Sequence, residues 1–359
     1  MPATTYPEFS IDTEGLEVTK AFADQVRGKT VIVTGVNRAG IGFTTAHALA
    51  SQGPAHLIAA GRNLSKLQES IDAIKAEFPN VDYRALKVDL SSQASVRSAA
   101  AEVLSWDDIP AINILINSAG IMCVPERTLS EDGIELHFAT NHIGHWLLTC
   151  LLMPKLIKAS QDSPKGATRI VNVTSASSWV STMRWSDINF EKPNKELPQV
   201  EQPPYDFMKM WGYTDVEDKA YIPLDGYNRS KVANVLNSIG TTNRLYESHG
   251  ILSLAVHPGI ILTELARDFP KETMDAVGNL SGEDWFHYKT QGAGSSTTLV
   301  AALDPKLGPG ETRNGKENYG VFLADCQISD ACLPLSVSSD EADKLWKLSE
   351  DLVKEQFAW

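Results

Sequence analysis

A strand, a glycine turn and a helix follow one another in residues 29–50. A β-branched run, Lys29-Thr-Val-Ile-Val-Thr, leads to Gly35, and further glycines at Gly40 and Gly42 precede an alanine-rich stretch. Glycines allow a tight turn and a close approach of the backbone to a ligand. The backbone N–H groups that open the following helix would then point at a phosphate group. The segment is therefore typical of a turn that binds a dinucleotide.

The same order of strand and helix repeats along most of the chain. Strand patterns fall at 30–34, 55–60, 82–88, 112–117, 168–174, 251–257 and 319–324. Helical patterns fall at 41–52, 64–77, 93–104, 131–158, 227–248 and 287–303. Alternation of this kind predicts a parallel sheet with helices on both faces. We therefore expect an α/β fold, a doubly wound parallel sheet of the Rossmann type.

The domain organisation follows from what separates these elements. No linker rich in glycine, serine or proline divides the 359 residues, which favours a single domain with additions. We expect an N-terminal extension at 1–27, a Rossmann-type dinucleotide-binding and catalytic domain at 28–335, and a C-terminal helix at 336–359. In that last segment three leucines recur at helical spacing, a pattern typical of core packing.

Residues 176–226 interrupt the alternation, and we interpret them as an insertion. The segment concentrates proline, aromatic and methionine side chains, at Pro193, Pro198, Pro203, Pro204, Trp185, Tyr205, Phe207, Met208, Met210, Trp211 and Tyr213. One interpretation is that these side chains line a pocket for a bulky apolar molecule. The other is that they pack against their own chain or a sister subunit in a homodimer. The sequence leaves both interpretations open.

The charge and the cysteines limit the classes of partner and compartment. A formal net charge of −13 would repel a phosphate backbone, so nucleic acid is not an expected partner. Residues 1–28 contain no long apolar run, so we expect neither a secretory signal nor a membrane anchor, and a cytoplasmic protein. The four cysteines lack metal spacing and are expected to be free thiols, with a Cys326–Cys332 disulfide as the alternative.

Tyr227 and Lys231 stand four residues apart in the predicted helix at 227–248. That spacing places both side chains on one face of a helix, one turn apart. A free phenol titrates near pH 10, so a tyrosine that donates a proton near neutrality needs its pKa lowered by roughly 2–3 units. We expect the ammonium group of Lys231, in a dry site, to supply much of that change.

Several motifs occur in a fixed order around this pair. They are the turn at 29–42, Asn117-Ser-Ala-Gly120, Asn141, Ser175, Tyr227 with Lys231, and Pro258-Gly259. Together they resemble the short-chain dehydrogenase/reductase family over approximately residues 28–330. Residues 186–191 and 319–326 resemble its retinol-dehydrogenase-like and WW-domain-oxidoreductase-like branch, and no WW module is recognisable. Two departures stand out: four residues, rather than the usual three, separate Gly35 from Gly40, and Ser118 replaces an asparagine.

The resemblance implies an oxidoreductase that interconverts a ketone or aldehyde and an alcohol. Tyr227 would donate or accept the proton, and Lys231 would hold the nicotinamide ribose and lower the phenol pKa. Ser175 would hydrogen-bond the substrate oxygen, and Asn141 would anchor a water leading from Lys231 to solvent. The hydroxyls of Thr174, Ser177 and Ser178 are rivals of Ser175, which we prefer because it directly follows the strand Ile170-Val-Asn-Val-Thr.

The resemblance also places the cofactor contacts. They are Gly35, Asn37, Arg38, Gly40, Ile41 and Gly42 in the turn, Arg62 after the second strand, Asp89 and Leu90 after the third, Asn117, Ala119 and Gly120 after the fourth, Tyr227 and Lys231, and Pro258, Gly259 and Thr263 after the sixth. Three of them have plainer interpretations. Arg38 is equally consistent with a solvated loop charge, and Asp89 and Thr263 are both candidate caps of the helices that follow.

The choice of nicotinamide cofactor depends on the position after the second strand. Enzymes that use NAD place an acidic residue there to bind the ribose 2′-hydroxyl, whereas this chain has Gly61 followed by Arg62. A guanidinium group can bind a 2′-phosphate with two hydrogen bonds. We therefore expect NADP(H), with Arg62 or Arg38 as the main phosphate ligand.

Other functions remain as alternatives. His137, Asn141, His142 and His145 lie on one predicted helix, but no acidic ligand completes a metal site, and we expect none. The altered glycine turn leaves open a cofactor-binding regulator or scaffold without turnover. The same pocket is also compatible with a cyclase or isomerase that uses Tyr227 as an acid. The favoured hypothesis is an NADPH-dependent reductase of a bulky apolar or polycyclic carbonyl compound.

Overall fold

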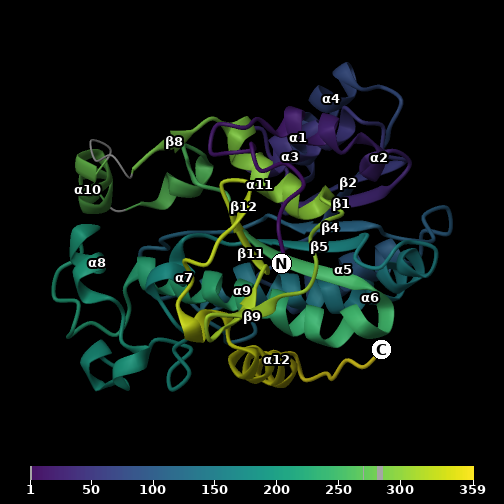
Figure 1. The fold of residues 1–359 in the computed structure, drawn as a ribbon. Coiled ribbons are helices and arrows are strands. Elements are labelled where there is room, and N and C mark those ends of the chain that lie inside the picture. The colour runs from purple at the N-terminus through teal and green to yellow at the C-terminus, as the bar shows by residue number, and fades with distance from the viewer. Residues whose placement is uncertain (1, 270, 281–285) are drawn as a thin grey trace.

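An eight-stranded sheet runs through the centre of the chain (Figure 1). The computed structural model describes residues 2–269, 271–280 and 286–359. The strands, in chain order, are β1 Thr30–Thr34, β2 His56–Gly61, β3 Asp82–Lys87, β4 Ile114–Asn117, β5 Thr168–Val173, β6 Ile251–His257, β11 Phe322–Ala324 and β12 Gln327–Ile328. Their order across the sheet is β12-β11-β6-β5-β4-β1-β2-β3, parallel except for β12. The predicted doubly wound α/β fold is confirmed.

Helices cover both faces of the sheet, as Figure 1 shows. One layer contains α3 Ile41–Ala50, α4 Leu64–Glu77 and α11 Gln291–Leu303, and α1 Gly15–Ala21 and α2 Ala23–Val26 lie beside it. The opposite layer contains α5 Gln93–Leu104, α6 Gly144–Gln161 and α9 Pro223–His249, covered by α12 Ser339–Val353. Strand residues divide between the two cores: Val31 and Val33 face the first layer, and Ile32 faces the second. Burial on both faces explains why the strands read as continuous apolar runs.

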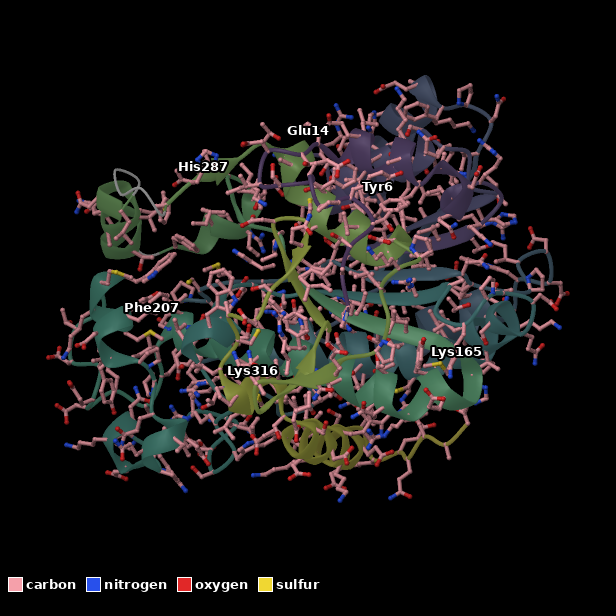
Figure 2. All side chains as sticks on the ribbon, viewed as in Figure 1. Tyr6, Glu14, Lys165, Phe207, His287 and Lys316 are labelled. Carbon is pink, nitrogen blue, oxygen red and sulfur yellow. The ribbon has the colours of Figure 1, made fainter. Side chains whose placement is uncertain are left out.

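The N-terminal extension folds against the first layer. α1 packs on α11 and α3, and Thr5 donates to the carboxylate of Asp304. Figure 2 shows Tyr6 and Glu14 on the same side of the sheet as α11. The extension therefore covers α3, which follows the glycine turn, and α11, which precedes the last strands of the sheet.

Several elements differ from their predicted bounds. The helix expected at 131–158 is a π-helix, Phe138–Ile143, that continues into α6. The strand expected at 319–324 is divided between β10 Lys316–Tyr319, which pairs with β9 Glu311–Arg313, and β11. The helix expected at 336–359 ends at Val353, because Lys354 adopts a left-handed conformation with φ 56°. Beyond it, the rings of Phe357 and Trp359 pack on Trp146 and Trp346.

The segment 176–226 forms short elements rather than a separate sheet. They are α7 Ser177–Val180, the 3-10 turns Asn194–Glu196 and Gln199–Glu201, and α8 Tyr205–Met210. α9 begins at Pro223, four residues before Tyr227, so the helix that carries Tyr227 starts inside the range predicted as an insertion.

The four cysteines are buried and free, so Cys326 and Cys332 do not form the alternative disulfide. None of the helices in the described part of the chain has the length and apolar composition needed to cross a membrane.

Candidate active site

The predicted motifs meet at one edge of the sheet. The glycine turn follows β1, Ser118–Gly120 follows β4, Ser175 follows β5, and Pro258 follows β6. Because the carboxyl ends of parallel strands share an edge, residues from distant parts of the chain become neighbours there. This edge is where doubly wound sheets bind their ligands.

The glycine turn is packed by backbone against backbone. Gly35 has φ +75°, and a Cβ placed on it would lie 2.7 Å from the Cα of Ala119. A Cβ on Gly42 would lie 2.5 Å from the carbonyl oxygen of Gly35. The extra residue is accommodated by a tight turn in which the N–H of Gly40 donates to the carbonyl of Asn37. The departure from the family's spacing therefore leaves the strand, turn and helix in order.

This turn fits a dinucleotide. Helix α3 begins at Ile41 without a side-chain cap, which leaves its first N–H groups directed out of the helix. The Oδ1 atom of Asn37 is buried without a hydrogen-bond partner. An uncapped helix start and an orphaned acceptor in the same turn are what a phosphate and a ribose hydroxyl would satisfy.

Thr34 and His145 hold the turn against the end of β4, a contact that the sequence did not predict. The Thr34 Oγ1 atom accepts from the N–H groups of Ser118 and Ala119, and it lies 2.8 Å from His145 Nε2. The His145 Nδ1 atom lies 3.0 Å from the Asn141 carbonyl oxygen. Burial lowers the pKa of His145 to about 4, so the ring is neutral and its Nε2 accepts a hydrogen bond from the Thr34 hydroxyl. The histidine thus orients a backbone segment.

Asn141 lies in the buried π-helix. Its Oδ1 accepts from the N–H of Ile121, and its Nδ2 donates to the carbonyl of Ile121 and to Ser230 Oγ. These bonds fix the loop after β4 against α9. π-Helical turns occur often at functional sites. No feature of the sequence around Asn141 indicated the π-helix.

Asn117 is buried, and its side-chain nitrogen is held by two neighbouring elements. Its Nδ2 donates to Thr149 and to Asn172 Oδ1, on the neighbouring strand β5. Its side chain is 1% exposed. The side chain therefore links β4 to α6 and β5, whereas Ala119 and Gly120 lie next to Gly35 and Lys231 respectively.

Tyr227 and Lys231 lie on α9 and are both buried. Lys231 Nζ donates to the carbonyl of Val173 at 2.8 Å and lies 5.7 Å from the centre of the Tyr227 ring. Burial lowers the pKa of Lys231 to about 7. Burial also raises the pKa of Tyr227 above its usual range, and a hydrogen bond with Ser175 opposes this rise. The expected lowering of the phenol pKa by Lys231 is therefore wrong for the protein alone, since desolvation dominates.

Ser175 is distinguished from its rivals by its contacts. It hydrogen-bonds Tyr227, and its Oγ lies 2.5 Å from Ser177 Oγ. The Thr174 hydroxyl donates to the carbonyl of Lys231, and the Ser178 hydroxyl lies 3.2 Å from the Cys332 sulfur. The structure therefore brings Ser175, Ser177, Tyr227 and Lys231 together.

The carboxyl ends of β2 and β3 border a surface hollow of about 600 Å³. It is lined by Arg62, Asn63, Leu64, Ser65 and Lys87. Gly61 pairs with Lys87 in the sheet, so the exposed cations Arg62 and Lys87 share one edge. The hollow's lining contains no acidic residue. Lys87 was missed because it reads as an ordinary polar strand end, and its pairing with Gly61 depends on the sheet register.

Arg38 in the glycine turn, and Asp89 and Leu90 after β3, each have contacts within the protein. The Arg38 guanidinium is exposed and stacks 4.7 Å from the Phe43 ring. Asp89 is not the cap of the next helix, because Ser92 caps α5 and Asp89 Oδ1 accepts from Ser91 instead. Leu90 packs closely on Gly144 at the start of α6.

The segment after β6 has a second close approach. Gly259 has φ +95°, and the side chain of Lys289 passes 2.5 Å from where its Cβ would be. Lys289 forms an ion pair of 2.6 Å with Asp325. Thr263 caps the 3-10 turn Glu264–Asp268 by accepting from the N–H of Leu265.

The three histidines near the π-helix have separate partners. His137 pairs with Glu135, His142 with Ser349, and His145 with Thr34. Across the described ranges, no group of three or more metal-ligating side chains converges. The spacing on one helix that first suggested a metal site therefore reflects three unrelated contacts.

Comparisons with known proteins assign the chain to a family. Residues 29–187 match the family model described as short chain dehydrogenase. The oxidoreductase fscI of Fusarium equiseti is 36% identical over 251 residues, which cover 70% of this chain and 94% of that protein. The chain belongs to the short-chain dehydrogenase family. It is also 34% identical to the chloroplastic short-chain dehydrogenase TIC 32 A of Brassica napus and 30% identical to mouse retinol dehydrogenase 12, over 90% and 92% of its length and 88% and 87% of theirs.

Solved structures give the same fold for this short-chain dehydrogenase. An uncharacterized protein from Mycobacterium paratuberculosis is 25% identical and superposes with a TM-score of 0.61 over 93% of this chain and 96% of that one. An NADPH-bound carbonyl reductase from chicken fatty liver is 22% identical, with a TM-score of 0.54 over 83% and 97%. These superpositions show the fold. Membership of the family makes the chain an oxidoreductase of the alcohol–carbonyl couple that takes a nicotinamide cofactor and a small-molecule substrate.

In this short-chain dehydrogenase the insertion packs around the tyrosine. An aromatic cluster joins the insertion, the loop after β4 and the segment after β6. Its members are Cys123, Met208, Val216, Ile222, Leu224 and Tyr227, with Met122, Tyr205, Phe207, Trp211, Tyr213 and Phe269 packed on them. Figure 1 shows α8 facing α10 Lys271–Leu280. The Tyr213 hydroxyl also donates to the Cys123 sulfur at 3.8 Å.

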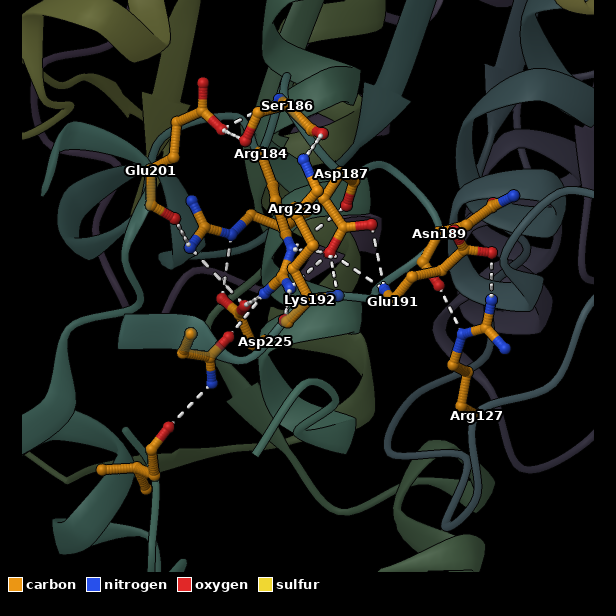
Figure 3. Close-up of polar contacts among 12 residues, drawn as sticks. Arg127, Arg184, Ser186, Asp187, Asn189, Glu191, Lys192, Glu201, Asp225 and Arg229 are labelled. Atoms are coloured by element: carbon orange, nitrogen blue, oxygen red, sulfur yellow. Dashed lines mark hydrogen bonds and ion pairs between the residues drawn. The ribbon is translucent and has the colours of Figure 1, made fainter. Parts of the chain in front are cut away.

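Buried charges attach the insertion to α9 (Figure 3). Asp225, two residues before Tyr227, is fully buried and lies 2.9 Å from Arg229 Nε and 3.8 Å from Arg184 Nη1. Arg184 also pairs with Asp187 at 2.6 Å. Arg229 donates to the carbonyls of Thr182 and Glu201. Every charge in this network has a partner, as buried charges require.

Proposed function

We propose that this short-chain dehydrogenase uses NADPH to reduce a bulky apolar ketone or aldehyde, with Tyr227 as the proton donor. The observation that carries the proposal is that Tyr227, Ser175 and Lys231 meet at the strand edge that also holds the glycine turn, where Ser175 favours the ionised form of Tyr227. A carbonyl oxygen placed between these two hydroxyls would accept from both. The cofactor supplies the hydride, so the protein must supply a proton and stabilise charge on the oxygen.

The roles of the other residues follow from their contacts. Ser175 would donate to the developing oxyanion, and Lys231 would hold the ribose of the nicotinamide. Ribose hydroxyl groups would accept hydrogen bonds from the Lys231 ammonium group and so favour its charged form, against the burial that lowers its pKa to about 7. Asn141 anchors the loop at Ile121 and Ser230, and so fixes the floor beside Lys231.

Preference for NADPH is supported by the hollow beside β2 and β3. Arg62 and Lys87 present two cations there, and the lining has no carboxylate to repel a 2′-phosphate. Arg38, which stacks on Phe43, is the secondary candidate for this role. Gly35, Asn37, Gly40, Ile41 and Gly42 would hold the pyrophosphate and the adenosine ribose.

Other contacts complete the proposed cofactor site. They are Asp89 and Leu90 near the adenine, Ala119 and Gly120 beneath the ribose, and Pro258, Gly259 and Thr263 beside the nicotinamide.

The alternative of a scaffold without turnover was motivated by the altered glycine turn. Because the turn absorbs its extra residue without disturbing the start of α3, that motive is weakened.

The substrate class follows from the aromatic cluster. Tyr227 is itself a member, so the surface next to the proposed proton donor is apolar and aromatic. Turnover should be measured with NADPH on a series of ketones of increasing size, from small aliphatic to polycyclic. We expect kcat/KM to rise with apolar size, by roughly 1–3 kcal/mol of binding for each added side-chain-sized group. A clear preference for small ketones would contradict the substrate assignment, and turnover without oxidation of NADPH would favour a cyclase or isomerase.

A further inference from the structure

Ser175 is the first member of a short chain of hydrogen bonds that ends inside the protein. Its Oγ lies 2.5 Å from Ser177 Oγ, and it also accepts from the Ser177 N–H at 3.0 Å. The Ser177 hydroxyl then donates to Asn228 Oδ1 at 2.8 Å. Ser177 and Asn228 are 4% and 3% exposed, so water does not compete for these bonds.

The direction of each proton can be counted. A hydroxyl has one proton to donate. Because Ser177 gives its proton to Asn228, the bond between the two serines must carry the proton of Ser175. Ser175 then serves Tyr227 only as an acceptor. In this arrangement Ser175 has no proton left for a substrate oxygen.

A substrate carbonyl requires the opposite direction. Its oxygen accepts hydrogen bonds and cannot donate, so Ser175 must turn its proton toward it. Ser177 must then donate to Ser175, and Asn228 must present its amide N–H₂ to Ser177. In the present orientation Asn228 Nδ2 is buried without a partner. A half-turn of the amide would bring that donor to Ser177, where Oδ1 now lies.

We infer that Ser177 and Asn228 are positioning residues, whose hydrogen bonds set whether Ser175 can donate to the substrate oxygen. We call the hydrogen-bonded chain of Ser175, Ser177 and Asn228 the relay. Its role rests on the proposed function, since it assumes that Ser175 donates to the substrate. Without substrate the protons run from Tyr227 through Ser175 and Ser177 to the Asn228 oxygen. With a carbonyl bound they run from the Asn228 nitrogen through Ser177 and Ser175 to the carbonyl, which Tyr227 also donates to. No covalent bond changes in the reversal.

An acceptor that cannot become a donor would lock the relay. Asn228→Asp is nearly isosteric, and its carboxylate only accepts. We expect this variant, assayed at pH 8, to lower kcat roughly 10²-fold, about the effect of losing one donor to the oxyanion. Asn228→Leu removes the acceptor, leaves Ser177 free to donate to Ser175, and should lower kcat much less. A purely structural role for Asn228 predicts the reverse order, because leucine loses the contact with Ser177 that aspartate keeps.

The relay acts through the Ser177 hydroxyl, so Ser177→Ala should uncouple it. In the Ser177→Ala background, we expect Asn228→Asp to change kcat within about twofold, the limit for independent sites. NADPH binding should be the same in all variants. An equal loss in both backgrounds would overturn the relay, since charge or local distortion would then explain the effect.

A second readout does not need turnover. A phenolate only accepts, so ionised Tyr227 also requires Ser175 to donate and the relay to reverse. The Tyr227 titration, followed by phenolate absorbance against Tyr227→Phe, should move to higher pH in Asn228→Asp, and by less when Ser177 is also alanine. Lys231 and Cys123 are the titratable groups beside Tyr227, and neither is changed in these variants. If the wild type reduces no carbonyl, the proposed function fails while this measurement still decides the relay, and equal shifts would contradict it.

Discussion

The glycine turn and the insertion border the same site, yet they are held in place by different physical means. The turn is built by backbone contacts with no room for a Cβ, as at Gly35 and Gly42. The insertion is held by buried side-chain charges, with Asp225 between Arg184 and Arg229. The contact of Gly42 with Gly35 is local, so a local sequence motif can encode it, although the contact of Gly35 with Ala119 also needs the folded sheet. The ion pair between Arg184 and Asp225, in contrast, joins residues more than 40 positions apart in the chain.

The two regions are therefore sensitive to different kinds of substitution. A turn made by backbone is sensitive to added volume, whereas a buried ionic network is sensitive to the loss of any one charge. The turn would fail by losing its ligand, and the insertion by losing stability around Tyr227. The predictions that follow test this contrast.

The largest effect on stability is expected in the insertion. Asp225→Ala leaves Arg184 and Arg229 as buried cations with less compensation, and should lower the free energy of unfolding by about 3–5 kcal/mol. Denaturant unfolding measures this loss. Asp218→Ala is the matched control, because it breaks the exposed pair with Lys195 and should cost at most about 1 kcal/mol. Equal losses in the two variants would mean that the buried network does not hold the insertion.

A smaller effect, confined to ligand binding, is expected in the turn. Gly42→Ala places a Cβ 2.5 Å from the Gly35 carbonyl oxygen, and the resulting displacement should weaken cofactor binding by about 1–3 kcal/mol. Titration of NADPH by fluorescence measures it. Gly308→Ala, where a Cβ meets nothing within 4 Å, serves as the control and should bind normally. Unaltered NADPH affinity in Gly42→Ala would show that the turn is not under this constraint.

These two regions also show what the sequence could predict. The strands, the turn and the Tyr227–Lys231 pair were predicted because each is encoded by residues close together in the chain. The Thr34–His145 contact, the π-helix around Asn141 and the place of Lys87 were not, because they depend on elements that meet only in the folded sheet. The Tyr227 pKa was predicted in the wrong direction, since spacing on a helix says nothing about desolvation.

The smallest effect is expected at the rim of the cofactor site. Arg62→Ala removes one of two exposed cations and should weaken NADPH by about 1–3 kcal/mol, the value of a hydrogen bond to a charged group. NADH, which lacks the 2′-phosphate, should bind as before. Competition binding of both cofactors to Arg62→Ala and Lys87→Ala would show how much each cation contributes to binding of the 2′-phosphate. An unchanged preference in both variants would move the phosphate contact to Arg38.

The central claim is that the Tyr227 phenol provides the proton beside a bound nicotinamide. Tyr227→Phe removes that hydroxyl and keeps the ring that packs in the aromatic cluster. Single-turnover reduction of a carbonyl substrate, with NADPH bound in advance, isolates the step. We expect normal NADPH affinity and a rate lower by roughly 10²–10⁴. A rate close to that of the wild type would contradict the account.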